Sequence, residues 1–294
     1  MRIFGTLGAL FVTFSAAGVA RAEPLAGPLA PPERREQRLW RREWPTFSWV
    51  EGVATVAAGA GTLVLALNPP PAEPRWRGGI LFDDAIRDSL RLDSESARQA
   101  TRSAGDWPYY TAGLLPLIAD PLVALWAHGD KKAALNLELM ALEAFSYAGL
   151  LSFVSTRASV RERPDSAECR RSSSDPESCP SDTESFWSGH SSMAAASAGI
   201  VCANHRAMRL WSNPVADASA CALASAGALF TGVSRVAADR HYATDVLLGL
   251  GVGFGVGYAV PTLLHYGRGP SRVNVTVRPG GLGGGAVLTV AGLL

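Results

Sequence analysis

The sequence predicts an all-α protein, built as a helical bundle of about six mostly membrane-spanning helices. Hydrophobic residues make up 48% of the 294 residues, which is an ordinary share, but they are gathered into long runs separated by polar segments. A run of roughly 20 apolar residues is long enough to cross a bilayer as a helix. The runs that follow the N-terminal segment lie at 47–67, 109–126, 133–153, about 190–204, 215–233 and 243–265.

The two ends of the chain differ from this central part. Residues 1–22 have the pattern of a secretory signal, with Arg2 before an apolar core and Ala20-Arg21-Ala22 as a small-x-small cleavage site. An uncleaved N-terminal anchor is the alternative. The other predicted parts are a Pro- and Arg-rich linker (23–46), the helical membrane domain (47–267) and a Gly-rich tail (268–294) with a short β-hairpin.

Charged and small residues within the runs carry further information. Glu51 and Asp120 are single charges in the first two runs, whereas Glu138 and Glu143 make the third the weakest candidate span. In the last run Gly249, Gly253 and Gly257 recur on one helix face, which predicts close packing on another helix. Ahead of the second run, "ILFDDAIRDSLRL" has apolar residues near helical spacing and predicts an interfacial helix.

The four cysteines divide into two pairs of different setting. Cys169 and Cys179 lie in one polar loop, 156–187, and predict a small disulfide if that loop is exported. Cys202 and Cys221 lie in Ala-rich apolar runs and are expected to be packed thiols. No Cys/His spacing suggests a zinc site, and the net charge of +1 offers no basic field for nucleic acid.

The distribution of basic residues predicts the orientation in the membrane. Three basic segments flank the runs, and by the positive-inside rule all three face the cytoplasm. They hold Arg34, Arg35, Arg38, Arg41 and Arg42; Lys131 and Lys132; and Arg206 and Arg209. The loops 156–187 and 234–242 would then lie outside. A cleaved signal would invert this arrangement if all six runs span, and we favour the three basic segments.

Polar motifs lie in these outer loops. In "SRVAADRHYATD", His241 and Asp245 are four residues apart and share a face if the segment is helical. A carboxylate on one ring nitrogen leaves the other free as a base or nucleophile, and the planar guanidinium of Arg235 suits phosphate oxygens. A salt-bridge cluster at the membrane interface is the alternative, because Arg235 and Asp239 are also four apart.

Two further motifs precede this one. "SGH" offers the Ser188 hydroxyl and the Gly189 amide at a helix start, an arrangement that binds anions, with His190 beside them as a proton donor. "RASVRERP" contributes Arg163 before Pro164. Each motif alone is weak, but their order and spacing are specific.

Together the motifs resemble the type 2 phosphatidic-acid phosphatase superfamily, which also includes vanadium haloperoxidases. The family pattern is Lys-x6-Arg-Pro, Pro-Ser-Gly-His and Ser-Arg-x5-His-x3-Asp. The third motif matches in full from Ser234 to Asp245. Trp187 replaces the proline of the second, and Thr156 stands where the first has lysine. The motifs, within 156–245, cover about 90 residues.

The resemblance implies a metal-independent phosphatase without a cofactor, acting through a phosphohistidine intermediate on a lipid-linked phosphate or diphosphate. It implies His241 as the nucleophile, Asp245 as the group that orients it, and His190 as the general acid. The implied phosphate-binding groups are Arg163, Arg235, Ser188 and the Gly189 amide, with Arg157 as our replacement for the lysine and Arg161 as the other candidate. Phosphatidate, phosphatidylglycerol phosphate, undecaprenyl diphosphate and lipid A phosphates are all compatible substrates.

The expected location is the bacterial inner membrane with the site facing the periplasm, and the expected partners are the lipid substrate and the membrane, not nucleic acid. Three other interpretations stay open. One is a vanadate-dependent haloperoxidase, with vanadate on His241. Another is a non-catalytic lipid-binding membrane protein of the same fold, and the last is a soluble or peripheral periplasmic phosphatase.

Overall fold

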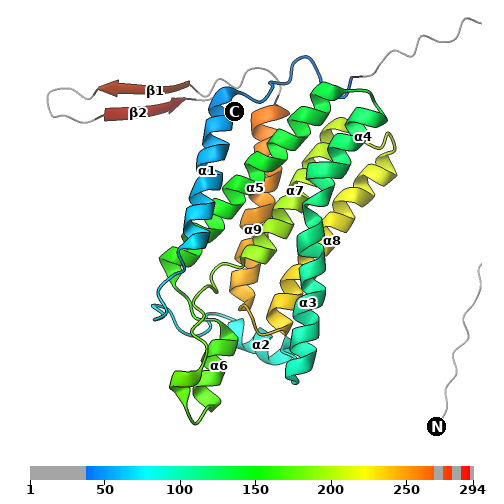
Figure 1. Ribbon diagram of the computed structural model, residues 1–294. Helices are drawn as coiled ribbons and strands as arrows, with labels where there is room; N and C mark the ends of the chain where they lie inside the picture. The colour runs from blue at the N-terminus through cyan, green and yellow to red at the C-terminus, as the bar shows by residue number, and fades with distance from the viewer. Residues whose placement is uncertain (1–37, 268–273, 280–285, 292–294) are drawn as a thin grey trace, which may run out of the picture. The chain divides into compact units, whose positions relative to one another are not determined.

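A bundle of long helices accounts for most of the chain, as Figure 1 shows. The computed structural model describes residues 38–267, 274–279 and 286–291. The signal, most of the linker and the connecting parts of the tail lie outside these residues. The long helices are α1 (Trp49–Leu67), α3 (Glu95–Ala112), α5 (Lys131–Ser159), α7 (Gly189–Met208), α8 (Pro214–Ala237) and α9 (Ala243–Ala259). The shorter ones are α2 (Asp83–Leu90), η1 (Leu115–Ala119), α4 (Asp120–Trp126), α6 (Pro164–Ser172), η2 (Pro176–Ser178) and η3 (Val260–His265).

Polar side chains fix where several of these helices begin. The Ser48 hydroxyl accepts from the backbone N–H of Glu51, whose carboxylate accepts in turn from the N–H of Ser48. This reciprocal cap satisfies backbone donors that a helix start leaves free. The single charge of the first apolar run therefore lies at the helix end rather than in its middle. The side chains of Asp130 and Asn213 cap α5 and α8 by accepting from backbone N–H groups of the first turn.

The predicted fold class is confirmed. Within the described ranges, five helices are long and apolar enough to cross a membrane: Trp49–Leu67, Glu95–Trp126, Lys131–Ser159, Pro214–Ala237 and Ala243–His265. The expected weakness of the third run is absent, because α5 is the longest of the helices. The fourth run, α7, is buried along almost its whole length and packs against α5, α8 and α9. Its small Ala, Ser and Gly residues suit this central position better than contact with lipid.

Glycines bring α9 against α7, as the sequence predicts. A Cβ atom at Gly249 would lie 2.7 Å from the Ser188 carbonyl oxygen. At Gly253 and Gly257 it would lie 2.0 Å from the carbonyl oxygens of Ser192 and Ala196. No real Cβ contact is that short, so the two backbones approach each other in a way that only glycine allows. This contact sets the start of α9 beside the start of α7.

Charged side chains inside the bundle are paired. His205 of α7 lies between two carboxylates, with Nδ1 2.7 Å from Asp217 Oδ1 and Nε2 3.3 Å from Asp120 Oδ1. The fully buried Glu143 of α5 lies 3.2 Å from Nε2 of His265. An unpaired charge in such surroundings is costly, so these contacts explain how polar residues are tolerated in the apolar runs.

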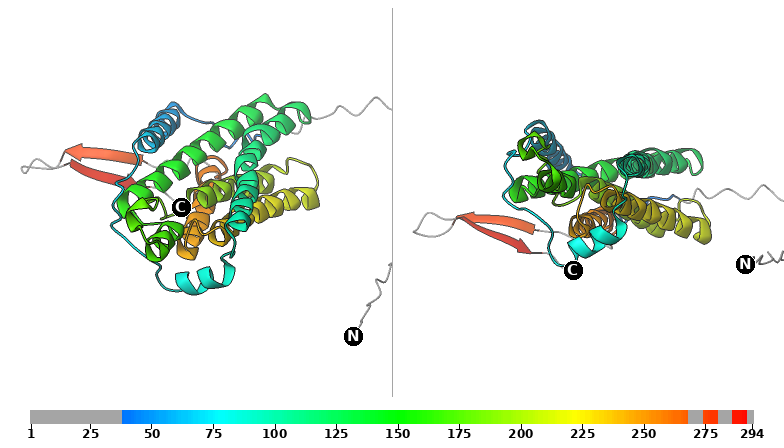
Figure 2. Two further views of the ribbon diagram at one scale, coloured as in Figure 1. Left: turned by 60° about the horizontal axis from the view of Figure 1, so that its bottom comes forward. Right: turned by 90° about the horizontal axis from the view of Figure 1, so that it is seen from below.

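The two helical turns of α2 cover one end of the bundle, in the segment where the sequence predicts an interfacial helix. Figure 2 shows α2 lying across the start of α9. The face of α2 that turns inward carries charge, since Asp83 and Arg87 are buried. Ile80 and Leu81 precede the helix and are exposed. The apolar spacing in this segment therefore does not mark the buried face, because ion pairs hold α2 in place.

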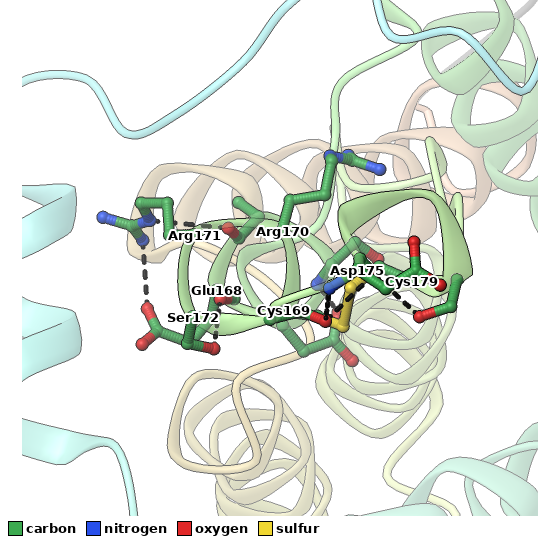
Figure 3. The surroundings of a disulfide bond; sticks show 12 residues. Glu168, Cys169, Arg170, Arg171, Ser172, Asp175 and Cys179 are labelled. Carbon is green, nitrogen blue, oxygen red and sulfur yellow. Dashed lines mark hydrogen bonds and ion pairs between the residues drawn. A yellow bond between two sulfur atoms is a disulfide. The ribbon is translucent and has the colours of Figure 1, made fainter.

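The polar loop between α5 and α7 contains α6 and η2 and is joined by a disulfide. Cys169 and Cys179 are bonded, as predicted, and Figure 3 shows the bridge closing α6 onto the loop that follows it. The prediction for the other pair is wrong. Cys202 of α7 and Cys221 of α8 are also bonded, with Cα atoms 4.5 Å apart, because small residues let these two helices approach closely.

The opposite end of the bundle collects the basic segments. Trp40 and Trp44, which precede α1, pack in one apolar cluster with Ala133 at the start of α5 and with Met208 and Leu210 at the end of α7. The basic residues of the three segments adjoin this cluster in sequence. The described residues of the three segments, which begin at Arg38 in the first, therefore lie at the end of the bundle away from α2 and α6.

The tail contains the predicted hairpin. Strands β1 (Asn274–Pro279) and β2 (Ala286–Ala291) pair antiparallel, with Asn274 opposite Ala291 and Pro279 opposite Ala286.

Candidate active site

A cavity of about 670 Å³ brings parts of all three motifs together. Its polar part lies at the end of the bundle where α5 and α8 finish and α7 and α9 begin. Arg163, Gly189, His190 and His241 line its polar end. The cavity continues between α1, α3 and α5 along apolar side chains that include Leu117, Leu142, Phe145 and Phe153. Its shape therefore joins a polar site to an apolar passage within the bundle.

His241 lies in the turn between α8 and α9 with a defined tautomer. Its Nδ1 lies 2.8 Å from the carbonyl oxygen of Ser185, and a carbonyl only accepts, so Nδ1 carries the hydrogen. Nε2 lies 3.2 Å from Nη1 of Arg163, which only donates, so Nε2 presents a lone pair. Burial, and next the nearby Arg163 cation, hold the pKa of His241 well below its usual range. The ring is therefore neutral, and its unprotonated Nε2 accepts from Arg163 at the cavity wall.

Asp245 does not contact His241 in the way that the spacing suggests. Its Oδ2 lies 3.9 Å from Nδ1 of His241, beyond hydrogen-bond distance. The carboxylate instead accepts from Arg161 at 2.5 Å, from the Ser185 hydroxyl at 2.6 Å and from the N–H of Tyr242 at 3.0 Å. The i,i+4 spacing fails because residues 239–242 form a turn and the helix begins only at Ala243. Asp245 and His241 are linked only indirectly: the Ser185 hydroxyl donates to Asp245, and the Ser185 carbonyl accepts from Nδ1 of His241.

Arg163 directly precedes α6 as its N-cap residue, and its guanidinium is held from two sides. Its Nε donates to Asp182 Oδ1 at 2.7 Å, and Nη1 donates to the carbonyl oxygen of Arg240 at 3.3 Å. Arg240 itself pairs with Asp182 at 2.7 Å and with Asp165. This network fixes the guanidinium of Arg163 beside Nε2 of His241 without drawing it away from the cavity.

His190 lies in the first turn of α7, against α3. Its ring packs on Tyr109 with centroids 4.3 Å apart, and Nε2 lies 3.6 Å from Oδ1 of Asp106. The same Asp106 oxygen accepts from Nη2 of Arg235, in the last turn of α8. Nε of Arg235 is buried and has no protein partner. One carboxylate of α3 thus joins the histidine of the second motif to the arginine of the third.

The two residues before His190 differ in their positions. The Ser188 side chain is buried and caps α7, accepting from the hydroxyl of Ser191 at 2.9 Å. Gly189 lines the cavity, and a Cβ there would lie 3.2 Å from the Ser152 hydroxyl oxygen. Of this pair, the glycine faces the cavity and the serine hydroxyl is engaged within the helix cap.

The first motif has no lysine, and the structure shows what occupies that position and its neighbours. Thr156, which stands at the lysine position, lines the cavity. Arg157 donates to Glu184 Oε1 at 3.1 Å and to the carbonyl oxygen of Leu65 at the end of α1. Arg161 is fully buried, 2.8 Å from Asp83 and 2.5 Å from Asp245. Both candidate arginines are thus engaged with acceptors of the protein.

Sequence reasoning missed several residues that the structure brings to the site. Asp106 of α3 and Asp182, Glu184 and Ser185 of the polar loop belong to no motif. The loop carbonyl at Ser185 has no sequence signal at all, because any residue supplies one. Asp106 could have been suspected as a lone charge just ahead of the second apolar run.

Comparison with known proteins gives three results. No curated protein sequence matches the chain. Among solved structures, a transmembrane PAP2-type phosphatidylglycerolphosphate phosphatase from Bacillus subtilis is similar, with a TM-score of 0.42 and 20% sequence identity. That match covers 71% of this chain and 95% of the other. The family model of the PAP2 superfamily matches residues 137–268, a range that contains all three motifs. Residues 137–268, just under half of the chain, are therefore similar to the PAP2 superfamily.

Proposed function

We propose that this protein is a metal-independent phosphatase that removes a phosphoryl group from a lipid-linked phosphate. The observation that carries the proposal is the shared cavity: an unprotonated histidine nitrogen, a second histidine and an arginine lie at its polar end, and a largely apolar part extends from them. A lipid phosphate has the same division between an anionic head and a hydrocarbon tail. The cavity is within the size range of small-molecule sites.

The proposed reaction has two steps. Nε2 of His241 attacks phosphorus, and the P–O bond to the lipid breaks as the N–P bond forms. His190 gives its proton to the departing oxygen, so that the lipid leaves as an alcohol. Water then attacks the phosphohistidine, His190 takes a proton from that water, and inorganic phosphate and free His241 are released.

Fixed donors supply the electrostatic stabilisation in this proposal. Arg163 carries a positive charge beside His241, and Arg235 carries one near His190. Asp182 holds Arg163 in place, and Asp106 holds Arg235. The Gly189 amide lies at the start of α7, where helix N–H groups favour an anion. Donors that are already oriented cost no rearrangement when charge develops on the phosphoryl oxygens.

We propose further that the site faces the periplasm. The basic segments adjoin the apolar cluster at the opposite end of the bundle, which agrees with the positive-inside rule. The disulfide Cys169–Cys179 lies at the site end and needs an oxidising compartment. Non-reducing peptide mapping of protein taken from membranes tests this orientation, and free thiols at both positions would contradict it.

The activity is tested by phosphate release from a panel of lipid phosphates by the purified protein in excess EDTA. We expect release to continue, because arginine side chains and amides bind the phosphoryl oxygens. Loss of activity that Mg²⁺ restores would contradict the proposed site. Lipid binding without phosphate release would favour a non-catalytic member of the fold, and halide oxidation with added vanadate would favour a haloperoxidase.

A further inference from the structure

A carboxylate lines the cavity on the side where the family pattern has a cation. Glu184 of the polar loop is a lining residue, together with Thr156, which stands at the lysine position. Arg157, next to Thr156, is turned to Glu184 and to the end of α1 and does not line the cavity. At this part of the cavity wall the lysine position is neutral and a carboxylate is present, and Arg157 pairs with that carboxylate at 3.1 Å without lining the cavity.

The charges of the cavity are therefore nearly balanced. Of the described residues that line it, Arg163 and Glu184 carry the fixed charges, of opposite sign. Arg163 is itself paired with Asp182 at 2.7 Å, and Arg235 behind His190 is paired with Asp106. Such a site has donors for one phosphoryl group but little excess positive charge for a second.

Glu184 is also close to the reacting group in the chain. Its neighbour Ser185 supplies the carbonyl that holds Nδ1 of His241. The Glu184 backbone N–H donates to Asp182 Oδ1 at 3.2 Å, and this same oxygen accepts from Arg163. The carboxylate is thus fixed at the rim by the loop that positions His241 and Arg163, and its Oε1 is fixed by Arg157.

We infer that Glu184 is a specificity-determining residue that makes this site prefer lipid phosphomonoesters to lipid diphosphates. The inference rests on the proposed function and names the substrate class for the same site. A diphosphate bound with one phosphorus at His241 places its second phosphate and its added negative charge in the cavity that Glu184 lines. Repulsion between like charges within a partly enclosed cavity changes affinity by about tenfold or more.

The test compares farnesyl monophosphate with farnesyl diphosphate, which share one hydrocarbon chain and differ by one phosphate. The quantity measured is the ratio of kcat/KM for the monophosphate to kcat/KM for the diphosphate, from initial rates. In Glu184→Gln, which keeps an acceptor for Arg157, the ratio should fall about tenfold, mainly through a lower KM for the diphosphate. In Glu184→Lys it should fall further, because a cation returns to the rim.

A matched control and a second measurement separate charge from folding. Glu177 in η2 is exposed in the same loop and does not line the cavity, so Glu177→Gln changes the net charge equally and should leave the ratio unchanged. In the wild-type protein, raising the ionic strength should lower the ratio, because salt screens the repulsion. This measurement needs no variant.

The outcomes are distinguishable. A ratio that stays within about twofold in both Glu184 variants and at high salt overturns the inference but leaves the phosphatase activity intact. The same fall in Glu177→Gln also overturns it, because the effect would then not come from the cavity. Absence of phosphate release from both substrates by the wild-type protein contradicts the proposed function and removes the inference with it.

Discussion

The Nδ1 atom of His241 lies 2.8 Å from the carbonyl oxygen of Ser185, and this contact fixes which ring nitrogen faces the cavity. A backbone carbonyl cannot be removed by substitution, and it holds the ring in one tautomer at every pH at which the ring is neutral. The Asp245 carboxylate supports this contact through the Ser185 hydroxyl at 2.6 Å rather than by touching the ring. The distinction leads to different expectations for the two residues.

Asp245→Asn should lower stability more clearly than it lowers the chemical step. The substitution leaves Arg161 buried with Asp83 as its remaining carboxylate, and breaking a buried ion pair costs about 3–5 kcal/mol. Thermal unfolding of the purified variant, beside its kcat at a temperature where it is folded, separates the two effects. A large loss of kcat at wild-type stability would show that Asp245 acts on His241 directly.

Asp106→Asn should weaken proton donation by His190. Burial, and next Arg235, lower the pKa of His190 to about 4, and the Asp106 carboxylate, 3.6 Å from Nε2, opposes this shift while it also holds Arg235. We expect kcat to fall by about ten- to a hundredfold on an alkyl phosphate, a part of the roughly 10²- to 10⁴-fold contribution of general acid catalysis, because His190 itself remains. The loss should be smaller on an aryl phosphate, whose leaving group needs little protonation.

Asp106→Glu, which keeps the charge, should recover part of the activity on the alkyl phosphate. Equal losses on both substrates in Asp106→Asn would mean that Asp106 acts only by placing Arg235.

The neutral state of His241 predicts a particular dependence of stability on pH. The pKa of His241 in the folded protein lies below its unfolded value because the ring is buried and next to Arg163. As pH falls below about 6.5 the unfolded chain takes up this proton first, so stability is full above that pH and declines below it. The decline from this group is at most about 1.4 kcal/mol per pH unit.

His241→Gln lacks the titrating group. The unfolding temperature of the wild type relative to this variant should therefore fall between pH 8 and pH 5, in phosphate-free buffer. A difference that stays constant over this range would show that His241 is not held neutral.

The close approach of α9 to α7 predicts contrasting effects of two neighbouring glycines. A Cβ at Gly253 would lie 2.0 Å from the Ser192 carbonyl oxygen, whereas a Cβ at Gly251 meets nothing within 4 Å. Gly253→Ala should destabilise the protein by several kcal/mol or prevent its folding, since the helices must separate. Gly251→Ala should be neutral or stabilising by about 0.5–1 kcal/mol, the gain in helix propensity. Detergent-solubilised yield and unfolding temperature of the pair provide the measurement, and equal behaviour would contradict the packing.

Much of the fold follows from the sequence because apolar runs and glycine spacing act locally. Glu51 could not be placed from composition, since only the cap at Ser48 shows that it ends a helix rather than interrupts a span. The pairing of Cys202 with Cys221 depends on the distance between two helices, which no local pattern gives. The ion pairs of α2 are likewise contacts between residues far apart in the chain, and they decide which face is buried.

For the site, the motifs locate the chemical groups but not their contacts. His190, Arg163, Gly189 and His241 gather at one cavity, as the motif order suggests. The partners of these groups come from α3 and from the polar loop, whose positions depend on tertiary packing. Spacing alone therefore suggests Asp245 as the partner of His241. In the structure Asp245 is too far from the ring, and the Ser185 carbonyl of the polar loop contacts Nδ1 instead.

The central claim is that His241 carries the phosphoryl group, and rapid-quench labelling with a ³²P-labelled aryl phosphate tests it most directly. The wild-type protein should form an acid-labile labelled intermediate, and His241→Ala should form none. His190→Ala should still be labelled by the aryl phosphate and should lose the label more slowly, because no group takes the proton from the attacking water. With an alkyl phosphate His190→Ala should form little label. A labelled intermediate in His241→Ala, or equal loss of labelling in both variants on both substrates, would contradict the account.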